Sequence, residues 1–142
     1  MRKQFLNLND LSRDKLENIF DISLELKQNS KTGDQLKNKY LGLIFEKPST
    51  RTRVSFEVAM TQLGGKASFL SVNDLQLGRG EPIEDTSKVL SSIVDGLVLR
   101  TMNHKTQEEF AQNSTVPIIN GLSNMSHPCQ LLADLLTFKE EK

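Results

Sequence analysis

Hydroxyl and arginine side chains stand together in one short segment between an apolar run and a helix-like pattern. They are Ser49, Thr50, Arg51, Thr52 and Arg53. The first turn of a helix has unpaired main-chain N–H groups and about half a positive charge from the helix dipole. Arginines at this position oppose the dipole, and a bound anion would remove that conflict. The segment therefore favours a phosphate site over the plainer interpretation of helix caps beside surface cations.

Two further candidate groups each follow an apolar run. Arg100 ends one run, and His127-Pro128-Cys129-Gln130 comes shortly after another. His127 can donate to or accept from a carbonyl oxygen, and Gln130 offers an amide. Taken singly, Arg100 is equally well a surface arginine, and His127 is better explained as a capping or packed histidine. Together with the phosphate segment, they indicate an acyl phosphate whose carbonyl is held beside its phosphate leaving group.

Cys129 stands within the second of these groups, so its chemistry needs a separate decision. A catalytic cysteine needs a base or a positive environment that lowers the pKa of its thiol. Cys129 has no neighbouring base in the sequence. We interpret it as a small residue at a helix start rather than as a nucleophile.

The pattern of apolar residues predicts which elements position these groups. It indicates a first helix capped by Ser12, followed by four strand–helix units. The strands are expected at 40–45, 67–72, 97–99 and 116–119, with the last near a sheet edge because it contains a proline. This alternation predicts the α/β class: a three-layer α/β/α domain with a mainly parallel four-stranded sheet. Ligands bind such sheets at the carboxyl ends of the strands, where the candidate residues fall.

The expected helices have specific starts and inward faces. The helix after the first strand begins at Pro48-Ser49-Thr50 and ends at Gly64-Gly65. The next three begin at Asp85 or Thr86, at a capping box from Thr106 to Glu109, and at Pro128. Apolar spacing predicts two inward faces, which consist of Val89, Leu90, Ile93 and Val94, and of Leu131, Leu132, Leu135 and Leu136.

Composition excludes several classes of protein. The 142 residues carry 18 Lys and Arg against 18 Asp and Glu, and this zero net charge argues against a general nucleic-acid binder. A single cysteine excludes an intramolecular disulfide and a cysteine-based zinc site, and the two histidines are too far apart for a short metal motif. No apolar run approaches the ~20 residues of a membrane span, and the N-terminus has no signal-like stretch. We therefore expect a cytoplasmic protein without a membrane partner.

Three blocks of the sequence resemble the aspartate/ornithine carbamoyltransferase family. They are Phe45-Glu46-Lys47-Pro48-Ser49-Thr50-Arg51-Thr52-Arg53, Arg100-Thr101, and His127-Pro128-Cys129-Gln130. The blocks occur in the family's order, and together they are highly specific. Phe45-Glu46-Lys47 and the segment 75–86 are similar to the ornithine branch. Aspartate carbamoyltransferases usually carry a lysine in that segment, where Arg79 is the only basic residue here.

The resemblance implies an activity and a set of roles. The activity is carbamoyl transfer from carbamoyl phosphate to the δ-amine of L-ornithine, with neither a metal nor an organic cofactor. The implied phosphate ligands are Ser49, Thr50, Arg51 and Thr52. The implied contacts to the carbonyl and amide end are Arg100, His127 and Gln130, and the implied catalytic residues are Arg51, Arg100 and His127. Gln76 lies in a loop similar to one that reaches a neighbouring subunit's site, so a homotrimer or higher homo-oligomer is expected.

One departure from the family concerns length. The family's enzymes have a second α/β domain that binds the amino acid, whereas residues 1–142 resemble the carbamoyl-phosphate-binding domain alone. The chain also stops within a helical pattern, so we expect more protein to follow and the isolated chain to be incomplete for turnover. Two alternatives stay open: a carbamoyltransferase for aspartate, putrescine or an acylated ornithine, and a non-catalytic phosphate-binding module. The resemblance also leaves open whether arginine synthesis or breakdown is served.

Overall fold

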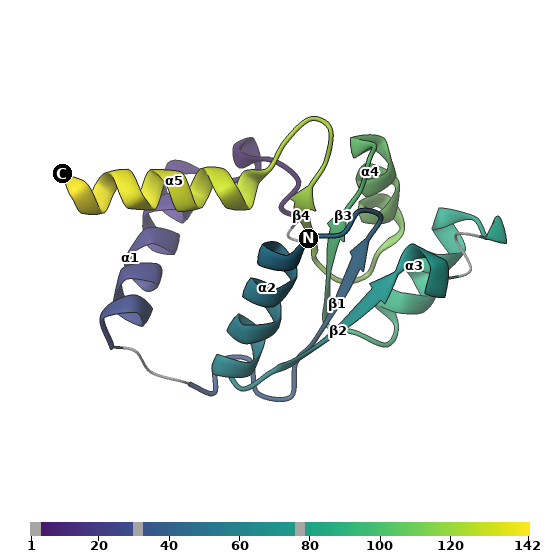
Figure 1. Cartoon of the computed structure of the whole chain (residues 1–142), viewed down its shortest axis with the longest axis horizontal. Helices are drawn as coiled ribbons and strands as arrows, with labels where there is room; N and C mark the ends of the chain where they lie inside the picture. The colour runs from purple at the N-terminus through teal and green to yellow at the C-terminus, as the bar shows by residue number, and fades with distance from the viewer. Residues whose placement is uncertain (1–3, 30–32, 76–78) are drawn as a thin grey trace.

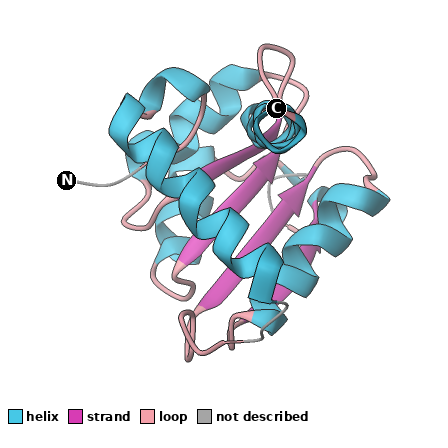
Figure 2. Ribbon diagram, turned by 90° about the vertical axis from the view of Figure 1, so that its left-hand side faces the viewer, coloured by secondary structure: helices cyan, strands magenta, loops and turns pink. Residues whose placement is uncertain are grey.

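A parallel four-stranded sheet forms the centre of the computed structural model, which describes residues 4–29, 33–75 and 79–142. Its strands are β1 (Tyr40–Phe45), β2 (Lys66–Ser71), β3 (Gly96–Arg100) and β4 (Ile118–Leu122). They lie in the order β2-β1-β3-β4, and all three pairings are parallel. Figure 2 shows the strand arrows running in the same direction between helices. The predicted α/β class and its parallel sheet are confirmed.

Helices cover both faces of the sheet. They are α1 (Arg13–Asn29), α2 (Thr50–Gln62), α3 (Ile83–Ser91), α4 (His104–Asn113) and α5 (Pro128–Glu141), with short 3-10 turns at Leu8–Asp10 and Val72–Asp74. In Figure 1, α1, α2 and α5 lie on one side of the sheet and α3 and α4 on the other. The three-layer arrangement is therefore also confirmed.

The two faces of β1 build two separate cores. Leu41, Leu43 and Phe45 pack with Met60 of α2, whereas Ile44 packs with Phe110 of α4. This alternation follows from the period of two along a strand, and the burial of both faces explains the continuous apolar run. Because all four strands are parallel, their carboxyl ends meet along one edge of the sheet. The candidate residues follow those ends.

Two predicted helix starts are wrong. Helix α3 begins at Ile83 directly after Pro82, and the Thr86 hydroxyl donates to Glu81 at 2.9 Å instead of capping a helix. Helix α4 begins at His104, where the Asn103 side chain accepts from the Lys105 N–H at 3.0 Å. Asparagine is a strong cap, so the earlier cap leaves Thr106 inside the helix. The cap at Ser12 is confirmed, since its Oγ accepts from the Lys15 N–H at 3.3 Å.

The fourth strand begins two residues later than predicted, and its predicted edge position is confirmed. Pro117 has no N–H to donate to the sheet, and it precedes β4 with its carbonyl accepting from Leu97 N at 3.0 Å. The outer edge of β4 pairs with Phe5, whose N–H donates to Ile118 O at 2.9 Å. A short N-terminal segment thus covers part of the exposed edge.

Half of each predicted inward face is wrong. Leu90 and Val94 pack against the core, but Val89 on α3 and Ile93, which lies just after the end of α3 at Ser91, are exposed. On α5, Leu132 and Leu136 are half-buried, whereas Leu131 and Leu135 are exposed. Helix α5 runs away from the sheet beside α1 in Figure 1. Two ion pairs join these helices, Lys139 with Glu17 and Lys27 with Glu140, each with an N–O distance of 2.8 Å. A helix that leaves the sheet has less core to face.

Candidate active site

The first turn of α2 begins where the sequence predicts it. Ser49 has an extended backbone, and its Oγ accepts from the Thr52 N–H at 3.3 Å. Arg51 and Thr52 occupy the first turn, and the Ser55 hydroxyl donates to the Arg51 carbonyl at 2.7 Å. This turn has no acidic residue, so its unpaired N–H groups and the Arg51 guanidinium present positive charge without a carboxylate in the same turn.

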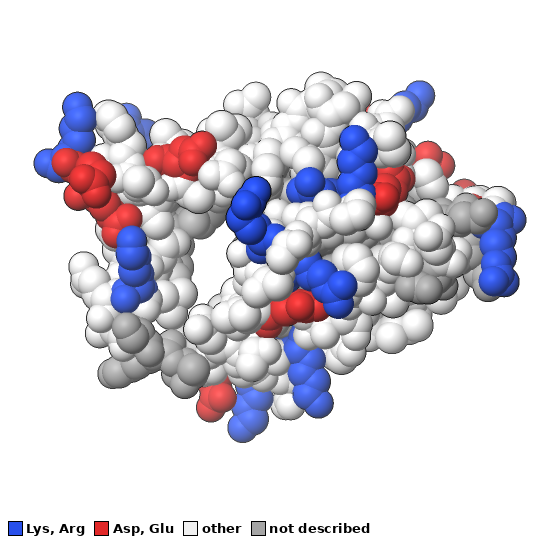
Figure 3. All heavy atoms as spheres, in the orientation of Figure 1, with Lys and Arg blue, Asp and Glu red and all other residues white. Residues whose placement is uncertain are grey.

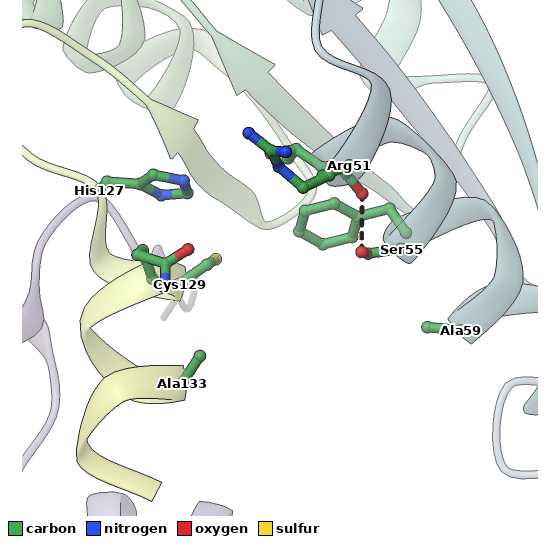
Figure 4. A pocket seen from close by; sticks show the side chains of 9 residues that line it. Arg51, Ser55, Ala59, His127, Cys129 and Ala133 are labelled. Carbon is green, nitrogen blue, oxygen red and sulfur yellow. Dashed lines mark hydrogen bonds between the residues drawn. The ribbon is translucent and has the colours of Figure 1, made fainter. Parts of the chain in front are cut away.

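A pocket of about 360 Å³ separates the start of α2 from the start of α5. Its lining consists of Arg51, Thr52, Ser55, Phe56, Ala59, His127, Cys129, Gln130 and Ala133. In Figure 4 the Arg51 guanidinium and the His127 ring point toward one another from opposite walls. The fold therefore brings together four of the predicted site residues from two blocks that are about half the chain apart: Arg51, Thr52, His127 and Gln130.

Ser49 and Thr50 line an adjoining depression of about 1030 Å³, which also contacts Lys47 and Arg53. Figure 3 shows the molecule hollowed between α1 and α2, with Lys and Arg side chains along part of the opening. Arg100 is not among the residues that line the smaller pocket, although its charge acts on His127. Gln76 lies outside the described residues.

His127 and Arg100 share one electrostatic environment. Burial lowers the pKa of His127 below its ordinary value, the positive charge of Arg100 lowers it further, and Asp134 opposes both. The His127 ring is therefore mostly neutral at pH 7. Within the part of the chain that the structure describes, His127 Nδ1 and Arg100 Nε are buried without a hydrogen-bond partner. Buried polar atoms normally have partners, so two unpaired atoms here indicate a ligand position.

Gln130 and Cys129 make different contributions to the wall that α5 provides. The Gln130 amide donates to Asp134 one turn later at 2.9 Å. Burial raises the pKa of the Cys129 thiol to about 11, and its Sγ lies 3.6 Å from the Asn120 carbonyl oxygen. A thiol with this pKa is protonated near pH 7, which supports the interpretation of Cys129 as a structural residue.

Arg53 is already engaged within α2 and β2. Its Nε lies 3.1 Å from a Glu57 carboxylate oxygen, and its guanidinium lies 3.8 Å from the centre of the Phe69 ring. An arginine held by an ion pair and by stacking on a ring has less freedom to bind a ligand. Arg51, by contrast, points into the pocket, so of the two arginines in this segment it is the one placed to bind a ligand.

Sequence reasoning missed a buried polar network at the carboxyl ends of β3 and β4. His104 Nδ1 lies 2.7 Å from Ser123 Oγ, and the Gln107 amide reaches Leu99 O, Thr101 Oγ1 and Leu122 O. The available signal was the pair of polar residues His104 and Gln107, which lie three apart on one helix face. Spacing alone does not show that this face is buried.

Residues 4–29, 33–75 and 79–142 contain neither a metal-binding cluster nor a membrane-spanning helix. In those residues, no three His, Cys, Asp or Glu side chains are grouped so that they could hold a metal ion. No helix there is both long enough and apolar enough to cross a membrane.

Solved structures similar to this chain include the anabolic ornithine carbamoyltransferase from Campylobacter jejuni, with 49% identity and a TM-score of 0.91. The match covers 99% of this chain and 45% of that one. An acetylornithine transcarbamylase complexed with acetylcitrulline is 32% identical, with a TM-score of 0.88, over 98% of this chain and 48% of that one.

Curated relatives also match nearly the whole of this chain over about half of their own length. The ornithine carbamoyltransferase of Syntrophotalea carbinolica is 57% identical over 145 residues, covering 100% of this chain and 48% of the relative. That of Archaeoglobus fulgidus is 57% identical over 141 residues, covering 97% and 46%. The chain thus spans about half the length of these relatives. Residues 3–140 match the family model described as "Aspartate/ornithine carbamoyltransferase, carbamoyl-P binding domain". The chain therefore belongs to the aspartate/ornithine carbamoyltransferase family, within the part that this model describes.

Proposed function

We propose that this chain forms the carbamoyl-phosphate half of an ornithine carbamoyltransferase. The reaction transfers the carbamoyl group of carbamoyl phosphate to the δ-amine of L-ornithine and yields L-citrulline and phosphate. The observation that carries the proposal is the pocket in which Arg51 and His127 face one another, beside the carboxyl ends of the strands. Residues 1–142 act as the carbamoyl-phosphate-binding domain, and a second domain binds the amino acid.

The first turn of α2 binds the phosphate group. The ligands are the side chains and main-chain N–H groups of Ser49, Thr50, Arg51 and Thr52. The helix dipole and the planar guanidinium of Arg51 both favour a doubly charged phosphate at this position. The same guanidinium also reaches the carbonyl oxygen and thereby holds the substrate in a geometry suited to attack.

The carbonyl and amide end of the substrate contacts Arg100, His127 and Gln130. The neutral δ-amine of ornithine attacks the carbamoyl carbon and forms the new C–N bond. The C–O bond to phosphate then breaks with its electron pair on the leaving oxygen, and the attacking nitrogen passes a proton to the departing phosphate. Negative charge grows first on the carbonyl oxygen, where donors from Arg51, Arg100 and His127 stabilise it. One well-placed donor of this kind contributes about 3–4 kcal/mol.

The lowered pKa of His127 is consistent with this role. A neutral imidazole donates from one ring nitrogen and accepts at the other, so it can bind a carbonyl oxygen without carrying a proton that the amine would take. The substrate already carries a good leaving group, and the reaction proceeds without a metal or an organic cofactor.

The same proposal covers the amino acid that accepts the carbamoyl group and the assembly of the subunits. Two relatives named ornithine carbamoyltransferase are each 57% identical to this chain, against 32% for the acetylornithine transcarbamylase structure, which favours ornithine over its acylated form. The similar Campylobacter jejuni protein is an anabolic ornithine carbamoyltransferase, which favours a role in arginine biosynthesis. We also propose a cytoplasmic homotrimer in which the loop with Gln76 contacts the site of a neighbouring subunit.

Calorimetric titration tests the proposal, using fresh carbamoyl phosphate and, separately, inorganic phosphate. We expect carbamoyl phosphate to bind more tightly, because only this ligand offers a carbonyl to Arg100 and His127. The Arg51→Ala variant is expected to lose binding of both ligands. Arg13→Ala is the matched control, since it removes the same charge from an exposed position on α1.

Two results would contradict this proposal. Equal affinity for the two ligands in the unaltered chain would favour a non-catalytic anion-binding module. Normal carbamoyl-phosphate binding by Arg51→Ala would exclude the assigned site.

A further inference from the structure

The pairing of β3 with β4 changes register beside Arg100. Leu99 lies opposite Asn120, but Arg100 lies opposite Leu122, so Gly121 is one extra residue on β4. A β-bulge of this kind bends its strand and changes the direction of nearby side chains, and bulges are frequent next to active sites. At this bulge the affected side chain is the half-buried Arg100.

Close approach of the two strands accompanies the bulge. A Cβ atom on Gly121 would lie 3.0 Å from Val98 Cγ1 and 3.3 Å from the Leu99 carbonyl oxygen. The strands are therefore in contact here, and a side chain larger than hydrogen would push them apart.

The side chain of Gln107, on α4, bonds to both sides of the bulge. Its Nε2 lies 3.1 Å from Leu99 O and 3.1 Å from Thr101 Oγ1, which belong to the two chain neighbours of Arg100. The same nitrogen lies 3.0 Å from the carbonyl oxygen of Leu122, the residue opposite Arg100 on β4. One buried amide thus bonds to the chain before Arg100, after it and across from it.

The orientation of this amide follows from its partners. Two of the three oxygens belong to main-chain carbonyls, which only accept, so the atom facing them is the amide nitrogen. Thr101 Oγ1 donates to the Asn103 carbonyl at 2.8 Å and is therefore free to accept from Gln107.

Burial of Gln107 costs free energy, and filling space in the core does not by itself offset that cost. The residue is fully buried, and its Oε1 has no hydrogen-bond partner among the described residues. A buried acceptor without a partner costs about 1–3 kcal/mol. A methionine or leucine would fill a similar volume without that cost, so the benefit of the amide lies in the three oxygens that its two N–H groups contact.

We propose that Gln107 is a positioning residue: it holds the ends of β3 and β4 in the bulged arrangement and thereby aims Arg100 at the site. Its bond to Leu122 also fixes the strand end from which the chain continues to His127. The inference relies on the proposed function only for the ligand that Arg100 binds. The geometric part, which relates Gln107 to the placement of Arg100, is independent of that ligand.

The first test compares two variants that each remove a buried bond from a side chain to a main-chain carbonyl. Gln107→Met removes the amide, and Ser87→Ala removes a hydroxyl that donates to Phe110 O at 2.8 Å between α3 and α4, away from the bulge. We expect Gln107→Met to weaken carbamoyl-phosphate binding at least about fivefold, the scale of coupling between contacting residues. Ser87→Ala is expected to lose stability without losing affinity. Equal affinities in the two variants would overturn the proposal.

A double-mutant cycle then asks whether Gln107 acts through Arg100. If it does, Gln107→Met weakens binding in the unaltered chain but has little further effect once Arg100→Ala is present. Additive losses would show that Gln107 supports the fold in general and would contradict the positioning role. Gln107→Glu keeps the side-chain length and, when protonated, one donor, so its affinity is expected to fall between those of Gln107→Met and the unaltered chain.

The last measurement uses no ligand. NMR titration follows the His127 ring, which responds to the charges of Arg100 and Asp134 and faces Arg51 across the pocket, in a chain that has two histidines. If Gln107→Met lets Arg100 withdraw, the pKa of His127 rises, whereas Ser87→Ala leaves it unchanged. An unchanged pKa in Gln107→Met would overturn the inference. Failure of the unaltered chain to bind carbamoyl phosphate would instead overturn the proposed function.

Discussion

The main-chain N–H of Glu46 donates a hydrogen bond to the carbonyl oxygen of Arg100 over 2.8 Å. The Glu46 carboxylate also accepts from the Met102 N–H at 2.6 Å. These two bonds join the turn before α2 to the turn after β3. The first of these turns leads to Arg51 and the second follows Arg100, so one residue fixes the distance between the segments that carry both arginines.

Glu46→Ala is expected to loosen that connection. It removes the acceptor for Met102 N while keeping the main-chain bond to Arg100, and we expect a loss of about 1 kcal/mol in the free energy of unfolding. Affinity for carbamoyl phosphate should fall in the same variant, because the two segments lose their fixed spacing. Urea unfolding and calorimetry measure the two effects. Glu46→Gln retains an oxygen acceptor and serves as the control; if it loses as much affinity as Glu46→Ala, the negative charge matters rather than the bond.

Acidification is expected to destabilise the chain through His127. Burial and the charge of Arg100 lower the pKa of this ring in the folded protein, so the unfolded chain binds a proton more readily. The contribution is fully present above the ordinary pKa of about 6.5 and is lost as the pH falls through the lower folded value. We expect the melting temperature of the unaltered chain to fall more than that of His127→Gln between about pH 7.5 and about pH 5.5. Parallel pH profiles of the two proteins would count against this assignment.

The Cys129 thiol is expected to react slowly with alkylating reagents. Burial raises its pKa from 9.0 to about 11, which reduces the thiolate fraction about a hundredfold at pH 8. Labelling with iodoacetamide, followed by mass spectrometry, should therefore be slow in the folded chain and fast in guanidinium, where the same residue is exposed. Rapid labelling of the folded chain would show that the thiol is activated and would reopen a chemical role for it.

The sequence was sufficient wherever one local pattern had one structural solution. The run Tyr40–Phe45 is β1 with the predicted bounds, because a continuous apolar stretch of this length fits a strand covered on both faces. The hydroxyl and arginine segment also lies at a helix start, because Ser49 provides a cap for it. Both features depend on neighbours within a few residues.

Features that depend on distant partners were not predictable in the same way. Val89 follows the apolar spacing of its helix but is exposed, because the position of α3 on the sheet decides which face is covered. In the sequence Gln107 looks like an ordinary helix residue. Its three oxygen partners come together only at the bulge beside Arg100. The facing of Arg51 and His127 is an intermediate case, since the rule for parallel sheets predicts a common edge but not a common pocket.

The end of α2 provides a final prediction about stability. Gly64 follows this helix with a φ of +85°, a left-handed conformation, and a Cβ atom there would lie 3.0 Å from the Gly33 carbonyl oxygen and 3.2 Å from Asp34 Cα. Gly80 has nearly the same φ, +86°, but a Cβ atom on it would meet nothing within 4 Å. Both alanine variants must adopt an unfavourable backbone conformation, at about 1 kcal/mol each. Only Gly64→Ala must also displace backbone atoms, so its total loss is expected to reach about 2–3 kcal/mol. Equilibrium urea unfolding of the two variants measures the difference, and equal losses would mean that the segment around Gly33 moves aside at no cost.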